Sequence, residues 1–222
     1  MDTYSLSKAG GWSRLSGRIG GLQDLLSAAI FFWVWLDPTG WRHDLVGYGL
    51  LAMLMEFALI HASVMFGMAR DPGQPHPVAG KAALGMLGFY LLLVAGFALN
   101  FDDLWVLAGA AWLLIAKAWP LIHSSADAAA VSYAQRWMWG ASVFYYLLAV
   151  GATALLPVPR LGITGHGASY GIDGISGLWV SQPQMAVAAL TLYFLLIGVT
   201  RVSGADQRAA DAHHAGLPEN NA

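Results

Sequence analysis

Long apolar stretches alternate with short polar segments along most of the chain. Six stretches are candidates to cross a bilayer, and they cover residues 22–36, 45–68, 82–99, 104–122, 137–156 and 185–200. A backbone in lipid must satisfy its own hydrogen bonds, so each stretch is expected to be a helix. The stretches are too long and too uniformly apolar for the strands of a transmembrane barrel. The sequence therefore predicts an all-α fold, a polytopic membrane bundle of six transmembrane helices.

Polar residues, glycines and prolines mark the ends of these stretches. The first stretch is the weakest, because fifteen residues rise only about 22 Å as a helix, and it has Asp24 near its start and Asp37-Pro38 at its end. Pro183 precedes the sixth stretch and suits the first turn of a helix. Residues 1–203 are predicted to form the transmembrane domain. Residues 204–222 are polar and are predicted to form a disordered tail.

Composition supports the membrane class and narrows the function. Charged residues make up 11% of the chain, against about 25% in ordinary soluble domains. The formal net charge of -2 gives no basic field for a nucleic-acid partner, so none is expected. The chain has no cysteine, which excludes disulfides, thiolate metal sites and thiol nucleophiles.

The distribution of Lys and Arg predicts the orientation. With the N-terminus inside, the outer segments hold only Arg42 and Arg160, and the inner segments hold Lys8, Arg14, Arg18, Arg70, Lys81, Arg136, Arg201 and Arg208. This asymmetry agrees with the positive-inside rule and favours both termini inside. We therefore expect a protein integral to a bacterial inner (plasma) membrane, with the lipid bilayer as its first partner.

Two charges inside apolar stretches are the first candidate site. Glu56 lies about 16 Å below the outer start of the second stretch, and Lys117 lies about 20 Å below the outer start of the fourth. Both depths are close to the midplane, where a charge usually faces a partner or a wet cavity. The sequence predicts that Glu56 and Lys117 form a polar site for an ion or substrate. A buried pair that only fixes helix packing is the alternative.

Two histidines are the second candidate site. His61 and His123 are both expected in the inner half of the bundle, on different helices. Two imidazoles at similar depth suit the axial positions of a b-type haem, or a copper site. Each histidine could equally hydrogen-bond a neighbour. Glu56 and His61 are five residues apart and do not form the HExxH pattern, so a hydrolytic zinc site has no support.

Three further expectations concern packing. The glycine-rich outer loop, residues 157–182, is interpreted as a flexible connector, with an outer lid or a partner-docking surface as the alternatives. Trp112 falls in the middle of the fourth stretch and is expected to be buried. No Gly-xxx-Gly pattern for close helix contact is seen within the six stretches.

Three functions fit this sequence. The first is a small transporter or channel-like protein that uses Glu56 and Lys117. The second is a haem- or metal-binding redox subunit that uses His61 and His123. The third is a non-catalytic subunit or scaffold that needs a membrane-protein partner or a second copy of itself. No catalytic triad or carboxylate pair can be argued, so an enzyme is not favoured.

Overall fold

The computed structural model describes residues 3–40, 45–69, 85, 88–96, 99, 107–112, 128–165, 167–170 and 176–215. This part of the chain is helical and contains no strand. The principal helices are α1 (Thr3–Leu36), α2 (Leu45–Ala69), α5 (Ala128–Leu155) and α7 (Pro183–Val202). Three short elements complete the set: η1 (Gly167–Tyr170), α6 (Leu178–Ser181) and α8 (Ala205–Ala215). The all-α prediction is confirmed for the described residues.

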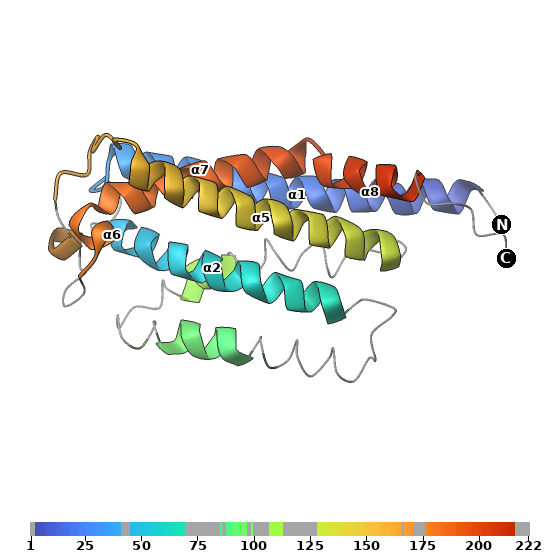
Figure 1. The fold of residues 1–222 in the computed structure, drawn as a ribbon, viewed down its shortest axis with the longest axis horizontal. Helices are drawn as coiled ribbons and strands as arrows, with labels where there is room; N and C mark the ends of the chain where they lie inside the picture. Colours follow the sequence, from blue (N-terminus) through green and yellow to red (C-terminus); the bar gives the residue numbers. More distant parts are fainter. Residues whose placement is uncertain are drawn as a thin grey trace.

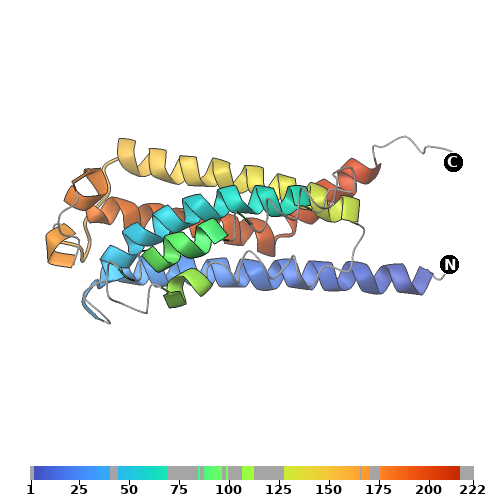
Figure 2. The same ribbon diagram turned by 90° about the horizontal axis from the view of Figure 1, so that it is seen from below.

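The long helices form one bundle along a common axis (Figure 1). Helix α7 is central and packs against α1, α5 and α2. It lies between α1 and α5 in the perpendicular view (Figure 2). Its apolar window is 67% buried, against 33% for the window in α1 and 22% for that in α5. A polar group on α7 is therefore the best placed to meet polar groups of several other helices.

Within the part of the chain that the structure describes, three helical segments are long and apolar enough to cross a membrane: Gly17–Leu36, Arg136–Leu155 and Pro183–Val202. They correspond to the first, fifth and sixth predicted stretches, and Pro183 occupies the first turn of α7 as expected. Helix α2 begins at the predicted residue and carries a shorter apolar segment, Leu45–Ile60. Residues 88–96 and 107–112, within the third and fourth stretches, are also helical. The total of six spans stays a prediction.

Large apolar side chains cover the outside of the bundle. Leu22 and Trp33 of α1 are 59% and 58% exposed, and Phe144 and Leu147 of α5 are 60% and 61% exposed. Soluble proteins rarely leave wide apolar surfaces open to water. These outer faces are compatible with a membrane protein whose helices are solvated by lipid.

Helix α1 is much longer than the predicted first stretch. It begins at Thr3, and its apolar window begins at Gly17. Gly17 and Gly21 form a Gly-xxx-Gly pattern just before residue 22, outside the six predicted stretches but within the longer apolar window of α1. A Cβ atom at Gly21 would lie 2.8 Å from the backbone nitrogen of Val202 in α7. Small residues here let the two backbones approach closely.

The outer loop is packed rather than loosely connected where the structure describes it. Trp35 donates its indole N–H to the carbonyl of Pro159 at 2.9 Å, and the Gly162 amide donates to the carbonyl of Trp35 at 3.1 Å. Ile163 is fully buried with Val34 and Val187, which belong to α1 and α7. The interpretation of this loop as a flexible connector is therefore corrected for its first part, which forms a cap on the helix ends.

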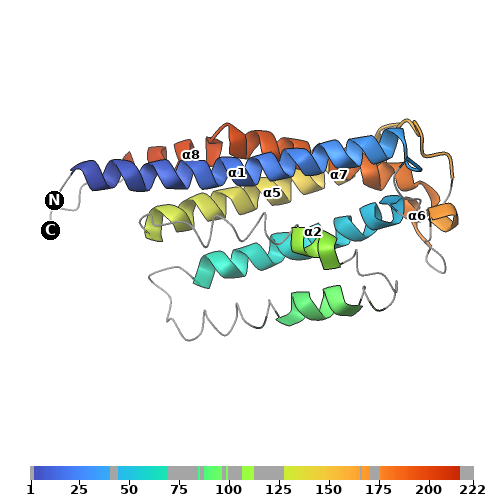
Figure 3. The same ribbon diagram turned by 180° about the vertical axis from the view of Figure 1, so that it is seen from behind.

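Helix α8 occupies most of the region expected to be a disordered tail. A glycine with φ of 68°, Gly204, precedes it, and Asp206 is in its first turn. Polar composition favours disorder in residues 204–222, but residues 205–215 also contain four helix-favouring alanines in their first eight positions. Contacts with α5 and α7 hold α8 against the bundle, at the end where α1 begins (Figure 3). The division at residue 203 stays a prediction.

A reporter fusion can test the orientation. We expect a reporter fused after Arg208 to read as cytoplasmic, because basic residues are concentrated in the predicted inner segments. A second fusion within the 157–165 loop is the control and should read as external. A cytoplasmic signal from both fusions would contradict the N-in, C-in topology.

Candidate functional site: a polar cluster inside the bundle

Glu56 is the most deeply buried carboxylate of the described residues. It lies on α2 with 0% exposure. The hydroxyl of Tyr193, on α7, donates a hydrogen bond of 2.9 Å to its Oε2 atom. A charge-assisted bond of this kind is among the stronger hydrogen bonds of proteins. The sequence prediction that Glu56 faces a polar partner is consistent with this contact, although the partner seen here is a tyrosine of α7.

Aromatic rings surround this contact. The rings of Tyr193 and Tyr146 meet edge to face with their centroids 5.9 Å apart, and Phe57 packs on Tyr146 at the same centroid distance. The Tyr146 hydroxyl donates to the carbonyl of Met53, one turn before Glu56 on α2, at 3.2 Å. These contacts join α2, α5 and α7 near Glu56, which is itself fully buried.

An ion pair lies nearer the α8 end of α7. Arg201 donates to Oδ2 of Asp24, on α1, across 2.7 Å. The Asp24 side chain is 1% exposed and that of Arg201 is 10% exposed. Tyr193 is affected electrostatically by both of these charges as well as by Glu56. The ion pair and the Glu56 contact thus each involve one residue of α7.

A ring of hydrogen bonds fixes Trp112 to α1. Its indole N–H donates to the hydroxyl of Ser27 at 2.9 Å, and its carbonyl accepts a bond of 2.6 Å from Gln23. Ser27 in turn donates to the carbonyl of Gln23 at 3.0 Å. Trp112 is 39% exposed, so the expectation that it is buried was wrong. Its polar N–H group, rather than its bulk, decides its position.

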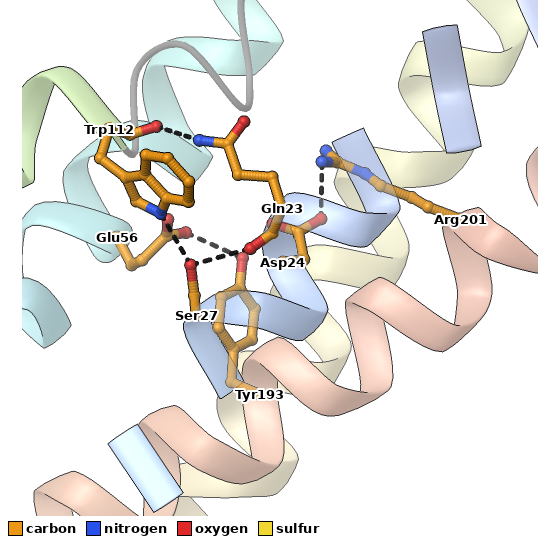
Figure 4. A network of polar contacts seen from close by, with 7 residues as sticks. All are labelled: Gln23, Asp24, Ser27, Glu56, Trp112, Tyr193 and Arg201. Atoms are coloured by element: carbon orange, nitrogen blue, oxygen red, sulfur yellow. Dashed lines mark hydrogen bonds and ion pairs between the residues drawn. The ribbon is translucent and has the colours of Figure 1, made fainter. Parts of the chain in front are cut away.

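These residues form what we call the polar cluster (Figure 4). Its members are Gln23, Asp24, Ser27, Glu56, Trp112, Tyr193 and Arg201. They come from α1, α2, α7 and the helical segment 107–112. The cluster thus places polar groups of several helices in the interior of an apolar bundle, where such groups commonly mark ion or substrate pathways.

Three of the four predicted site residues cannot be placed within this cluster. Lys117 and His123 lie outside the described residues. His61 is in α2, but its side chain is also outside the described part. The predicted Glu56–Lys117 pair and the b-type haem or copper site of His61 and His123 therefore stay predictions. Among the side chains that are described, no group of three His, Cys, Asp or Glu residues could hold a metal ion.

Sequence reasoning missed the Asp24–Arg201 pair and the role of Tyr193. Asp24 was treated only as a polar residue near the start of a short stretch, and Arg201 only as part of the inner basic flank. A stronger signal was available, because Asp24 lies well inside the longer apolar window that starts at Gly17. An acid at that place needs a cation, and Arg201 ends the other apolar helix with a basic residue in its last turn.

A further carboxylate lies close to the ion pair. Oδ1 of Asp206, in the first turn of α8, is buried and accepts no hydrogen bond from the part of the chain that the structure describes. Burial raises the pKa of Asp206 above its ordinary value, while local backbone hydrogen bonds and the charges of Arg201 and Arg208 partly oppose this effect. Arg201 thus contacts the carboxylate of Asp24 and also interacts electrostatically with that of Asp206.

Comparisons of this chain with protein-family models, with curated proteins and with solved structures gave no match. The chemistry of the polar cluster must therefore be argued from its own residues. A carboxylate that is enclosed by aromatic rings and contacts a phenol can bind and release a proton, or hold a cation. It has no adjacent nucleophile among the described residues with which to attack a substrate.

Proposed function

We propose that this chain is a small membrane transport protein in which Glu56 binds and releases a proton. The observation that carries the proposal is the fully buried carboxylate of Glu56 on α2, held by the Tyr193 hydroxyl of α7. Ionisable residues inside spanning helices are costly, and in transporters and pumps they form proton relays. Lys117, which the sequence predicts at a similar depth, is proposed as a second charge of this site.

The position of Tyr193 supports this proposal. Its hydroxyl donates to the ionised form of Glu56, and it could accept a hydrogen bond from the protonated form after a rotation of the O–H bond. Tyr193 is on the central helix and is also within the electrostatic reach of the Asp24–Arg201 pair. A change of charge at Glu56 therefore alters its interaction with Tyr193 of α7. This helix contacts the three other long helices.

Proton flux into liposomes tests the proposal. The purified full chain is reconstituted into vesicles that contain a pH-sensitive dye, and a potassium gradient with valinomycin supplies the driving potential. We expect faster proton entrance than in protein-free vesicles, and we expect Glu56→Gln to reduce the rate to that of the empty vesicles, because the amide cannot carry the proton. Tyr193→Phe keeps the ring and loses the hydroxyl, so it should give a reduced but measurable flux.

The matched control is Asp37→Asn, the same chemical change at an exposed carboxylate beyond the end of α1. It should transport as the unchanged protein does. Flux from the unchanged protein no faster than that of empty vesicles would overturn the proposal. Equal flux from the unchanged protein and Glu56→Gln would show that protons move without this carboxylate.

A further inference from the structure

We infer that an apolar layer at the loop end of the bundle separates Glu56 from the aqueous phase at that end, and that Ile163 is the part of the layer that withdraws to admit water. The loop lies at the end of the bundle opposite α8 (Figure 1). We call its residues 157–165 the cap. The inference rests on the proposed function, because a residue that carries protons across a membrane must exchange them with water on both sides.

The layer consists of buried apolar side chains from three helices and the loop. Its members are Val34 of α1, Val46 of α2, Val187 of α7, and Ile163 and Tyr170 of the loop. Their one polar side-chain atom, the hydroxyl oxygen of Tyr170, accepts a hydrogen bond of 3.2 Å from the amide of Gly165. The other side chains offer water no hydrogen-bond partner, and apolar constrictions of this kind stop ions by excluding water.

The layer lies between the cap and the Glu56 contact. On α7, Val187 comes six residues before Tyr193, which is about 9 Å along the helix axis. On α2, Val46 comes ten residues before Glu56, which is about 15 Å. Both helices therefore place the layer on the loop side of the carboxylate.

The interval between the layer and Glu56 is also filled by apolar side chains. Phe31 of α1 stacks on Phe194 of α7 with the ring centroids 5.9 Å apart, and Leu190 of α7 is fully buried. Gly49 of α2 fits closely against this set, because a Cβ atom there would lie 3.3 Å from Val187 and 3.8 Å from Leu190. Water that enters between α1, α2 and α7 from the loop end must pass these side chains to reach Glu56.

The other side of Glu56 is different. Arg201 comes eight residues after Tyr193 on α7, about 12 Å farther from the cap, and it binds Asp24 of α1 at 2.7 Å. Charged side chains attract water, whereas the apolar layer excludes it. The structure therefore corresponds to a form of the protein that is closed at the loop end. Exchange of protons with that end needs the layer to part.

The attachment of the cap suits a part that can be released. Two hydrogen bonds join it to one residue of α1, since Trp35 donates to the carbonyl of Pro159 at 2.9 Å and accepts from the amide of Gly162 at 3.1 Å. Between these bonds, Leu161 has a φ of 48°, in the left-handed region that residues other than glycine rarely adopt. This strain opposes the closed position of the cap, and the burial of Ile163 favours it.

Labelling of a single cysteine tests the barrier, because the chain has no cysteine of its own. Leu190→Cys places a thiol on the Glu56 side of the layer. The purified full chain in detergent is treated with a charged methanethiosulfonate, which reacts with a thiol that water reaches. We expect slow labelling with the unchanged cap. We expect labelling to be several-fold faster after Ile163→Ala, which removes most of the side chain that fills the layer, and to stay slow after Ile163→Val.

Gly162→Ala should open the cap in a different way. A Cβ atom at Gly162 would overlap the carbonyl oxygen of Leu36 and lie 2.7 Å from Pro38, so the loop must move away from the end of α1. This variant should also label faster. The matched control for Ile163→Ala is Leu156→Ala, which shortens an aliphatic side chain that is 63% exposed directly before the cap. It should label as slowly as the protein with the unchanged cap.

A second cysteine position recognises general unfolding. Ile197→Cys is fully buried on α7, on the far side of Tyr193 from the cap. It should label slowly with and without Ile163→Ala. Fast labelling at both positions after Ile163→Ala would mean that the whole bundle has loosened, and it would overturn Ile163 as a local barrier.

The outcomes separate this inference from the proposed function. Equal labelling rates of Leu190→Cys in all cap variants, or fast labelling with the unchanged cap, would overturn the barrier whatever the proton flux. The flux of the unchanged protein in the vesicles described above tests the role of Glu56 by itself. If labelling follows the expectation and the protein moves no protons, the transport role of Glu56 fails while the barrier stands.

Discussion

Replacing Arg201 with Met is expected to lower the free energy of unfolding by about 3–5 kcal/mol, the usual result of breaking a buried ion pair. The change leaves Asp24, which is 1% exposed, without the guanidinium group that it contacts at 2.7 Å. The carboxyl could then take up a proton, which would limit the loss. Asp24→Asn should give a loss of similar size, because it leaves Arg201 without its counter-charge.

The double variant Asp24→Asn with Arg201→Met distinguishes an interacting pair from two independent residues. If the two charges mainly balance each other, the double variant should recover much of the stability that each single variant loses. Chemical unfolding in detergent gives the free energy of unfolding of the four proteins in the cycle: the unchanged protein, the two single variants and the double variant. Losses that simply add in the double variant would contradict the direct interaction.

The control for this cycle is Arg160→Met. Arg160 is exposed in the outer loop and donates only a long hydrogen bond, 3.4 Å, to the carbonyl of Thr164. Exposed substitutions of this kind usually change stability by less than about 0.5 kcal/mol. A similar loss at Arg160 and at Arg201 would mean that the method reports lost positive charge rather than a buried pair.

The helices could be predicted from the sequence because they are determined by local features, namely apolar runs and the residues that bound them. Apolar runs bounded by Asp37-Pro38 and Pro183 determine where α1 ends and where α7 begins, and both boundaries agree with the structure. The predicted first stretch begins at residue 22 because hydropathy marks only the strongly apolar part of a helix, whereas α1 begins at Thr3 and its apolar window at Gly17. Helix α8 has no apolar run to mark it, because residues 205–215 are mostly polar or small.

The candidate site could be predicted only in part because its partners are set by packing. Glu56 can be recognised from the sequence because it is a carboxylate within an apolar stretch. The cost of burying its charge predicts that it faces a partner or a wet cavity. That Tyr193 is the residue that contacts it depends on α7 lying at the centre of the bundle. Tyrosine is common in membrane helices, and nothing in its local sequence distinguishes Tyr193 from Tyr145 or Tyr146. The order in which helices pack is a long-range property, which hydropathy alone does not specify.

Gly→Ala substitutions are expected to change stability in opposite directions at open positions of α5 and at the close contact of α1 and α7, although the sequence does not distinguish these glycines. Alanine has a higher helix propensity than glycine by about 0.5–1 kcal/mol, so Gly→Ala at an open helical position should stabilise the protein. Gly140 and Gly151 of α5 are such positions, because an added Cβ atom at either would have nothing within 4 Å. Gly140→Ala and Gly151→Ala are therefore expected to raise the midpoint of thermal unfolding, or to leave it unchanged.

Gly21→Ala and Gly198→Ala should do the reverse. The added Cβ atom would lie 2.8 Å from the Val202 nitrogen in the first case and 2.9 Å from the Leu25 nitrogen in the second. Backbone atoms cannot move aside as a flexible side chain can, so the two helices must separate, and overpacking of this kind typically destabilises by about 1–3 kcal/mol. Thermal unfolding of the four variants in one detergent gives the comparison. Stabilisation by Gly21→Ala and Gly198→Ala, as for the two α5 variants, would mean that α1 and α7 do not approach each other so closely. The contact between Asp24 and Arg201, which depends on the same approach, would then lose its support as well.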